Sequence, residues 1–462
     1  MRRLVWFVFC LLACGSLPAH AESDAPWRLQ EALSFPEALQ LSVEQRFRIE
    51  SLDDQFRIRR HGHDRAWASR TLAHARIHLA DVGGLGDFTF GAELIDSRIW
   101  AADRSVTRDT TLVNTAELLQ GYAQFATDIP EVGKLRVRGG RMTMNLGSRR
   151  LVARNRFRNT INAFTGVEAE WTSDSGQTLR GFYTLPVQRQ PTELDKLRDN
   201  DIEFDEESFD LQLYGAFFST PLVGLDAAEF YFYGLKERDR ERRPSRNREL
   251  YTPGFRLLRK PQAGAFDFNV EAALQFGETR ASSSARNDLE HFAQFYHGEI
   301  GYLFDCAFSP RISAQYDWAT GDNSPGDGRN ERFDTLFGAR AFDFGPTSLF
   351  GAFARSNINT PGAKFEVVPW KNVSAFVAYR AYWLASERDT WTTSGVRDPS
   401  GQTRRFVGHQ VWARVRWDVL PRNLRLEAGI AHLFRGEFLR GAPNANGQGA
   451  PTYVYGQTTI SF

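Results

Sequence analysis

The chain has 462 residues, of which 57 are Lys or Arg and 56 are Asp or Glu, so its formal net charge of +1 gives no cation excess for nucleic-acid binding. Charged residues make up 24% of the chain, and no run of about 18 apolar residues follows the N-terminal segment, which excludes transmembrane helices. Aromatic residues nevertheless reach 13%, with 38 glycines beside them. This combination is typical of a barrel whose strands face lipid on one side and water on the other.

The first residues have the pattern of a secretory signal. A basic pair at Arg2 and Arg3 precedes the apolar segment Leu4–Ala13, which is too short to cross a bilayer. Residues 19–21 read A-H-A, a small-residue cleavage site. We therefore predict a signal peptide over residues 1–21, cleaved near Ala21, and a mature domain over residues 22–462.

The cysteines leave one alternative open at this end of the chain. Leu11–Cys14 reads L-L-A-C, which resembles a lipobox and would make Cys14 a lipidated N-terminus. After cleavage near Ala21 only Cys306 remains, and a single thiol excludes an intramolecular disulfide.

Segments with alternating apolar and polar residues recur along the whole mature chain, most of them near the length of a tilted membrane-spanning strand. The predicted strands are Val43–Ser51, Thr71–Ala80, Asp87–Ser97, Ala116–Ala126, Lys134–Met142, Phe164–Thr172, Thr178–Pro186, Ser208–Phe218, Ala227–Lys236, Leu250–Arg259, Ala265–Gly277, His291–Phe304, Arg311–Ala319, Asn357–Val368, Asn372–Ala385, Gly408–Val419, Asn423–Phe434 and Thr452–Phe462.

The connections between these strands alternate between short and long. Short, turn-rich examples are Asp81–Gly86 and Leu420–Arg422, whereas Thr143–Ala163 and Thr320–Ser356 are long. Short periplasmic turns, long extracellular loops and an even strand count are typical of outer-membrane proteins. We predict an all-β fold: a single transmembrane antiparallel β-barrel of about 18 strands in outer-membrane lipid. A soluble domain that ends on a strand is the alternative.

Alternation also predicts which residues line the lumen. In Arg46–Ile49, for example, arginines alternate with Phe47 and Ile49. An arginine facing lipid costs about 2–4 kcal/mol at mid-bilayer, so these side chains should point inward. Arginines selected by alternation are Arg46, Arg48, Arg76, Arg136, Arg138, Arg414, Arg416 and Arg425. They favour a constriction that attracts anions. Ladders of Arg and Glu that only support the wall are the alternative.

One central stretch carries a family resemblance. It reads K-L-R-V-R-G-G-R-M-T-M-N-L-G-S-R-R-L-V-A-R-N-R-F-R-N-T from Lys134 to Thr160, followed by F-T-G-V-E-A-E-W. Further matching patches are Tyr316–Phe337, Phe353–Ile358 and Tyr382–Asp389. Together these segments resemble the alginate export family of outer-membrane porins.

The resemblance implies an 18-stranded barrel narrowed by inward-folded loops and lined by arginines, through which an anionic polyuronate diffuses. Residues carried over as pore-lining candidates are Arg46, Arg76, Arg136, Arg138, Arg149, Arg150, Arg154 and Arg355. The doubled glycine Gly139–Gly140 predicts a bulge that redirects Arg141, a further candidate. Expected partners are an anionic polysaccharide or a small organic anion, and a periplasmic export protein; the barrel is expected to be monomeric.

One loop offers a weaker metal hypothesis. Asp322, Asn323 and Asp327 lie in D-N-S-P-G-D-G, whose oxygen ligands would suit Ca²⁺. A turn built from Asx, Pro and Gly is the alternative. No other cofactor is expected.

Three other functions compete with polysaccharide passage. They are a general or small-anion porin, a structural barrel with a plugged lumen, and an outer-membrane hydrolase that uses strand histidines. The sequence contains no G-x-S-x-G, H-E-x-x-H or P-loop motif, and this absence favours a protein that is not an enzyme.

Overall fold

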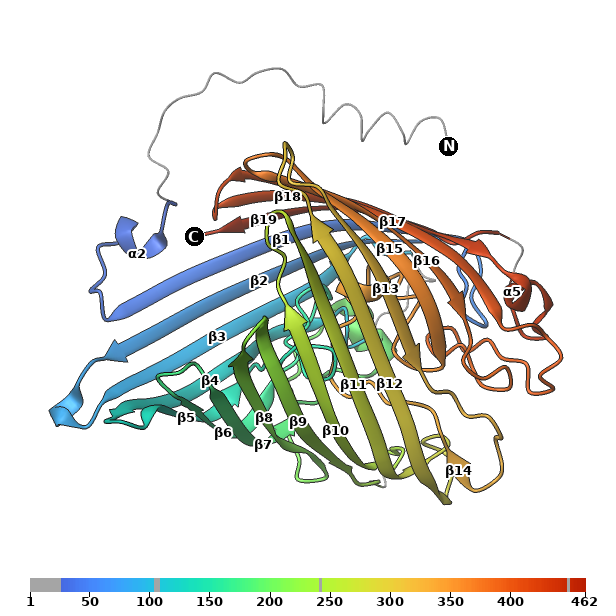
Figure 1. The fold of residues 1–462 in the computed structure, drawn as a ribbon, viewed down its shortest axis with the longest axis horizontal. Coiled ribbons are helices and arrows are strands. Elements are labelled where there is room, and N and C mark those ends of the chain that lie inside the picture. Colours follow the sequence, from blue (N-terminus) through green and yellow to red (C-terminus); the bar gives the residue numbers. More distant parts are fainter. Residues whose placement is uncertain (1–25, 104–108, 241–242, 447–448) are drawn as a thin grey trace.

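The computed structural model describes residues 26–103, 109–240, 243–446 and 449–462. The predicted signal peptide, its cleavage site and Cys14 lie outside these residues. Within them the chain is almost entirely β-structure, and Figure 1 shows the strands side by side as one curved sheet. Both Trp27, near the start of the described chain, and Phe462 lie at the same end, where their ring centroids are 4.9 Å apart.

The described chain contains eighteen long strands and one strand of two residues. Their bounds are β1 Leu39–Asp53, β2 Asp64–Leu79, β3 Asp87–Trp100, β4 Asn114–Ile129, β5 Gly133–Met142, β6 Phe164–Thr172, β7 Thr178–Pro186, β8 Leu211–Leu222, β9 Leu225–Glu237, β10 Glu249–Arg259, β11 Ala265–Arg280, β12 Asp288–Leu303, β13 Arg311–Ala319, β14 Arg329–Asn330, β15 Ile358–Trp370, β16 Val373–Trp383, β17 Phe406–Leu420, β18 Leu424–Arg435 and β19 Thr452–Ser461.

Helices are few and short. They are α2 Leu29–Ala32, α3 Leu194–Asp199, α4 Ala341–Phe344, α5 Glu437–Gly441 and a 3₁₀ turn at Val82–Gly84. Across the described ranges, no helix has both the length and the apolar character needed to span a bilayer.

Pairing between the first and last strands closes the sheet. β1 runs antiparallel to β19, with Glu44 opposite Ser461 and Asp53 opposite Thr452 (Figure 1). β13 pairs directly with β15, while the short β14 lies parallel to one end of β12. The result is a closed antiparallel barrel of eighteen strands, as the sequence predicts. Closure leaves no sheet edge whose backbone groups would lack partners in lipid.

Successive side chains along each strand alternate between the inner and outer faces of the wall, as the sequence predicts. On β1, Arg46 and Arg48 are 3% and 2% exposed, whereas Phe47 and Ile49 are 53% and 52% exposed on the outer surface. On β19, Tyr453 and Tyr455 point inward, where their hydroxyl groups donate to Glu50 and Glu427 at 2.9 and 2.8 Å. Apolar side chains therefore face lipid, and charged or hydroxyl groups face the interior.

Two local predictions are wrong. β2 begins at Asp64, although the sequence pattern placed residues up to Arg70 in a loop. Its first residues pair with β1 as far as Leu52, and Trp67 lies opposite Ile49 on the outward face. The alternation of apolar and polar residues is weak there, because Ala66 and Ala68 flank Trp67. The doubled glycine forms no bulge, because β5 keeps a continuous register with β4 and β6 through Gly139 and Gly140.

The packing of a lumenal tyrosine against a glycine on the inner face of the wall can be tested. A Cβ atom at Gly429 would lie 2.4 Å from the Tyr455 ring, whereas one at Gly456 would meet nothing within 4 Å. We expect Gly429→Ala to lower the free energy of unfolding by about 1–3 kcal/mol, because the ring must shift. Urea unfolding in lipid vesicles measures this, with Gly456→Ala as the control. Equal midpoints for the two variants would contradict the packing described.

Candidate functional site

Two long connections fold into the barrel and pack against each other. We call residues 143–163, between β5 and β6, the first inner loop, and residues 331–357, between β14 and β15, the second inner loop. Val152 and Phe337 form a parallel bridge between them, and the Ala339 amide donates to the Arg149 carbonyl at 2.9 Å. Leu151, Val152, Phe344 and Phe350 are at most 2% exposed, so the two loops form one packed unit.

Arginines on β1 and β2 hold the first inner loop to the wall. Arg46 donates to the carbonyls of Arg156 and Arg158 at 3.0 and 2.9 Å, and Arg70 donates to the same two carbonyls at 3.0 and 3.2 Å. The planar guanidinium presents several donors at once, which suits it to clamp a turn of backbone. This clamp directs the neighbouring Phe157 into the interior.

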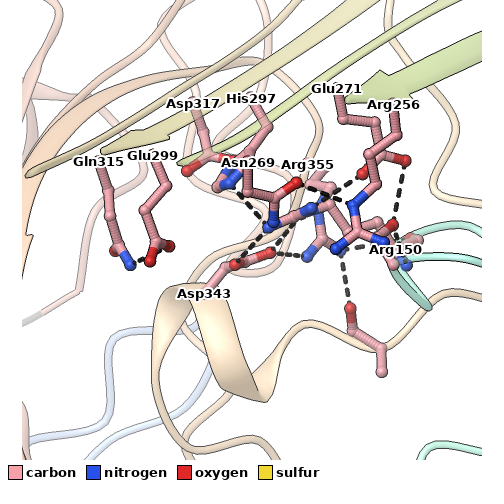
Figure 2. A network of polar contacts seen from close by, with 12 residues as sticks. Arg150, Arg256, Asn269, Glu271, His297, Glu299, Gln315, Asp317, Asp343 and Arg355 are labelled. Carbon is pink, nitrogen blue, oxygen red and sulfur yellow. Dashed lines mark hydrogen bonds and ion pairs between the residues drawn. The ribbon is translucent and has the colours of Figure 1, made fainter. Parts of the chain in front are cut away.

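A buried ionic cluster holds the middle of the second inner loop. Arg150, from the first inner loop, donates to Asp343 of α4 at 2.9 Å and to Glu271 of β11 at 2.8 Å, and Arg355 also binds Asp343 (Figure 2). Burial alone would raise the pKa of Asp343, but Arg150 and Arg355 hold this pKa well below its ordinary value. Both loops therefore meet at one carboxylate.

Other contacts fix the flanks of the second inner loop. Glu50 on β1 accepts from the Ser348 hydroxyl at 2.9 Å and from the Leu349 amide at 3.3 Å. The Trp391 indole donates to the Ala352 carbonyl at 2.8 Å. These contacts do not involve Asp343.

The inner loops and the wall enclose a cavity of about 590 Å³. It extends from Arg422, in the short turn between β17 and β18, to Phe342 on α4. Its lining contains eleven cationic side chains and only three carboxylates. The cations are Arg46, Arg48, Arg70, Arg149, Arg154, Arg156, Lys364, Arg414, Arg416, Arg422 and Arg425, and the carboxylates are Glu44, Asp418 and Glu427. The lining therefore carries a formal excess of eight positive charges.

Only part of this charge is compensated by ion pairs. Arg416 binds Glu427 at 2.7 Å, and Arg425 binds Asp418 at 2.6 Å. Within the described ranges, four cavity arginines have no carboxylate oxygen within 4.0 Å. These are Arg46, Arg149, Arg414 and Arg422. A charge without a partner in a site of low dielectric attracts a mobile anion more strongly than a paired one does.

Aromatic rings orient two of these free arginines. The Arg149 guanidinium lies 5.2 Å from the Phe342 ring centre, and that of Arg414 lies 4.8 Å from Phe376. A guanidinium over a ring keeps its N–H edge available, and this edge matches a carboxylate. The cavity can therefore bind carboxylates without first breaking a salt bridge.

Of the thirteen arginines predicted to line the pore, some line the cavity in the structure and the others lie elsewhere. Seven line the cavity: Arg46, Arg48, Arg149, Arg154, Arg414, Arg416 and Arg425. Sequence reasoning missed Arg70, Arg156, Arg422 and Lys364. Lys364 follows the alternation of β15 and could have been found, whereas Arg156 and Arg422 lie in loops with no periodicity.

The other six predicted arginines lie elsewhere. Arg136 and Arg138 face inward but form a ladder with Glu168 and Glu170, which was the alternative considered for them. Arg76 binds Gln40 near the short-turn end of the wall. These three residues are not part of the cavity lining.

The remaining three arginines do not line the pore, because their side chains lie in a buried cluster or on the outward face of the wall. Arg150 and Arg355 are 2% and 1% exposed inside the ionic cluster. Arg141 shares the outward face of Val137, because β5 has no bulge, and it binds Glu117 and Glu207.

The side chains of the candidate calcium loop form hydrogen bonds with neighbouring groups of the protein. In the part of the chain that the structure describes, no group of three or more His, Cys, Asp or Glu side chains is placed to hold a metal ion. Asp327 accepts from the Arg329 amide at 2.9 Å, which is an Asx turn, and Asn323 donates to Glu331. Calcium binding here stays a sequence-based prediction.

Comparison with known proteins identifies the family. The sequence model of the family described as "Alginate export" matches residues 36–452. The chain belongs to the alginate export family. A comparison with curated proteins gave no match.

Solved structures with a similar fold include a porin and an outer-membrane protein. OccK8 (OprE) of Pseudomonas aeruginosa and a BenF-like porin from Pseudomonas fluorescens Pf-5 each show 12% identity and a TM-score of 0.59, covering 92% of this chain and 98% of theirs. OccAB1 of Acinetobacter baumannii shows 11% identity and a TM-score of 0.57, with 92% and 97% coverage. At this identity the likeness concerns the fold. Family and fold together indicate an outer-membrane channel protein.

A pH dependence follows from two carboxylates that meet from different loops: Asp322 lies between β13 and β14, and Asp389 lies between β16 and β17. Burial, together with the nearby Asp389 carboxylate, raises the pKa of Asp322 to about 6. A folded-state pKa above the ordinary value stabilises the fold at low pH, and this contribution is lost as pH rises through about 6. We expect Asp322→Asn to raise the free energy of unfolding by about 1–2 kcal/mol at pH 8 and to have no effect at pH 4.

Thermal unfolding at the two pH values measures this, with Asp327→Asn as the control. An equal effect at both pH values would contradict the assignment. Stabilisation by added Ca²⁺ at pH 8 that disappears in Asp322→Asn would support the calcium hypothesis.

Proposed function

We propose that this outer-membrane channel passes anionic solutes, with an alginate-like polysaccharide or its oligomers as the natural class, through the cationic cavity. The observation that carries the proposal is a lining with eleven cations and three carboxylates, in which four arginines have no carboxylate partner. Three other lining cations pair with Glu50, Glu93 and Glu366, which lie just outside the lining. Charges without a partner offset the desolvation of carboxylates that enter a narrow site. The family description supports a polyuronate as the solute.

The arrangement of the cations supports passage rather than tight capture. They come from different strands and from the first inner loop, over the whole distance between Arg422 and Arg149. Conduction needs several moderate sites, since one strong site would stall the solute. The Arg422 end lies at the short turns, the side that faces the periplasm in outer-membrane barrels. An export protein that delivers a polymer to this end is part of the proposal, as is a monomeric barrel.

A porin for small organic anions is the second candidate. It is favoured by the inner loops, which close the cavity at α4 and leave about 590 Å³ in front of it. This volume suits a small anion, whereas a polymer requires that the inner loops move.

Replacing two free cavity arginines tests anion passage. We expect Arg149→Gln/Arg414→Gln to lower the anion-to-cation permeability ratio roughly two- to threefold, because two of the uncompensated charges are removed. Reversal potentials in planar bilayers under a KCl gradient measure this ratio. Arg404→Gln, on an outer loop and 80% exposed in its side chain, is the control.

Block by added solutes then separates the two candidates. Polymannuronate that blocks the native channel at lower concentration than a monomeric carboxylate, and blocks the double variant less, supports the polysaccharide. Equal block per carboxylate supports the small-anion porin. A native channel that prefers cations, or a double variant with unchanged selectivity, contradicts anion passage.

A further inference from the structure

One phenyl ring separates the cavity from two buried arginines. Phe342, on α4, lines the cavity. The same ring lies 5.6 Å from the Arg150 guanidinium and 5.5 Å from that of Arg355. If α4 moved away, the cavity would extend directly onto this pair of cations.

The buried cluster behind the ring has matched charges. Arg150, Arg355 and Arg380 are the cations, and Glu271, Asp317 and Asp343 are the anions, all with side chains at most 3% exposed. His297 donates to Asp317 and accepts from Arg150, so it enters the cluster as a neutral ring. Figure 2 shows Asp343 reaching this group from α4, while Asp317, His297 and Glu271 belong to strands of the wall.

Asp343 is the one anion of the cluster that does not belong to the wall. Glu271 lies on β11 and Asp317 on β13, whereas Asp343 lies on a four-residue helix. Withdrawal of Asp343 would leave a buried positive charge uncompensated, which is strongly unfavourable. The buried charge stays compensated if another carboxylate takes the place of Asp343 between Arg150 and Arg355.

The attachments of α4 permit such an exchange. Besides Asp343, α4 contacts the wall through Phe344, whose carbonyl accepts from Gln410 at 2.9 Å and whose buried ring lies 5.3 Å from the Arg380 guanidinium of β16. The flanks are held independently, by the bridge at Phe337 on one side and by the contacts of Leu349 with Glu50 on the other. Gly345, at φ +92°, directly follows α4 and has the backbone freedom of a hinge.

We propose that α4 is an internal gate and that the Asp343 carboxylate stands in for a carboxylate of the solute. This inference rests on the proposed function and specifies how the same site is regulated. In the closed state Asp343 occupies the Arg150–Arg355 site. In the open state a solute carboxylate occupies it, and α4 with Phe342 is displaced from the end of the cavity.

Tethering makes this gate selective for polyanions. Asp343 is held in the chain, so its effective concentration at the two arginines far exceeds that of a free monocarboxylate in solution. A polymer bound to Arg149 and Arg414 in the cavity presents its next carboxylate at a comparable effective concentration. Small anions therefore enter the cavity without opening the gate, whereas a polyuronate opens it.

Two variants test the gate in planar bilayers with the full-length protein. Asp343→Asn keeps the shape of the side chain but removes the charge, and we expect the open probability in KCl alone to rise about tenfold, because a neutral amide no longer competes for the arginines. Phe342→Ala leaves the ion pairs intact and removes the ring; we expect a larger conductance and a stronger anion preference. Polymannuronate added to the native channel should raise its open probability, and the block by this polymer should interrupt only the open state, whereas monomeric mannuronate should leave the open probability unchanged.

Asp334→Asn is the matched control. Asp334 is a partly buried carboxylate of the same inner loop, paired with Arg248 at 3.0 Å, but it does not line the cavity. The Asp334→Asn variant should have the same conductance and open probability as the native channel. Folding of each variant is judged by heat-modifiable migration in gel electrophoresis. If Asp343→Asn does not fold, the conductance of Phe342→Ala tests the gate.

The outcomes for the gate and for the proposed function can be told apart. Native conductance in both Asp343→Asn and Phe342→Ala overturns the gate, and so does an equal increase in Asp334→Asn. The proposed function still stands in that case if the native channel prefers anions and loses this preference in the Arg149/Arg414 variant. Conversely, a large rise in Asp343→Asn without any anion preference supports a gate in a channel of different selectivity.

Discussion

The structure depends on one constraint: in a closed barrel surrounded by lipid, charged side chains in the middle of the spanning strands have only the interior to occupy. Pairing of β1 with β19 satisfies the backbone groups of both strands, and alternation then sends every second side chain inward. Phe47 and Ile49 face lipid, and Arg46 and Arg48 between them are almost completely buried. The charged interior is therefore a consequence of closure.

The inward arginines have three different roles, and their nearest neighbours decide which. Arg138 faces Glu168 on the next strand and belongs to a neutral ladder that braces the wall. Arg46 and Arg70 meet carbonyls of the first inner loop and clamp it. Arg414 meets the ring of Phe376 and no carboxylate within 4.0 Å in the described chain, so its charge acts on the cavity. Arginine thus supports the wall at one position, fixes a loop at another, and contributes positive electrostatic potential to the cavity at a third.

This division links the stability of the barrel to its proposed function. Arg46 and Arg70 clamp the first inner loop and also line the cavity, and Arg149 and Arg414 add charge there without a carboxylate partner. Asp343 then supplies a carboxylate where the loops meet. In the proposed gate a solute carboxylate has the same chemistry, so the interaction that closes the interior is the one with which an anionic solute competes.

The sequence by itself determined the barrel, its eighteen strands and the face of most residues, because period-two alternation is local and lipid penalises every charge on the wrong face. It also determined that arginines such as Arg46 and Arg414 point inward. Only the tertiary structure decided which of them are free, because a partner such as Glu168 or a loop carbonyl comes from a distant part of the chain. Arg150 shows the difference: its motif was visible in the sequence, but its burial against Asp343, 193 residues away, depends on how two loops fold inside the barrel.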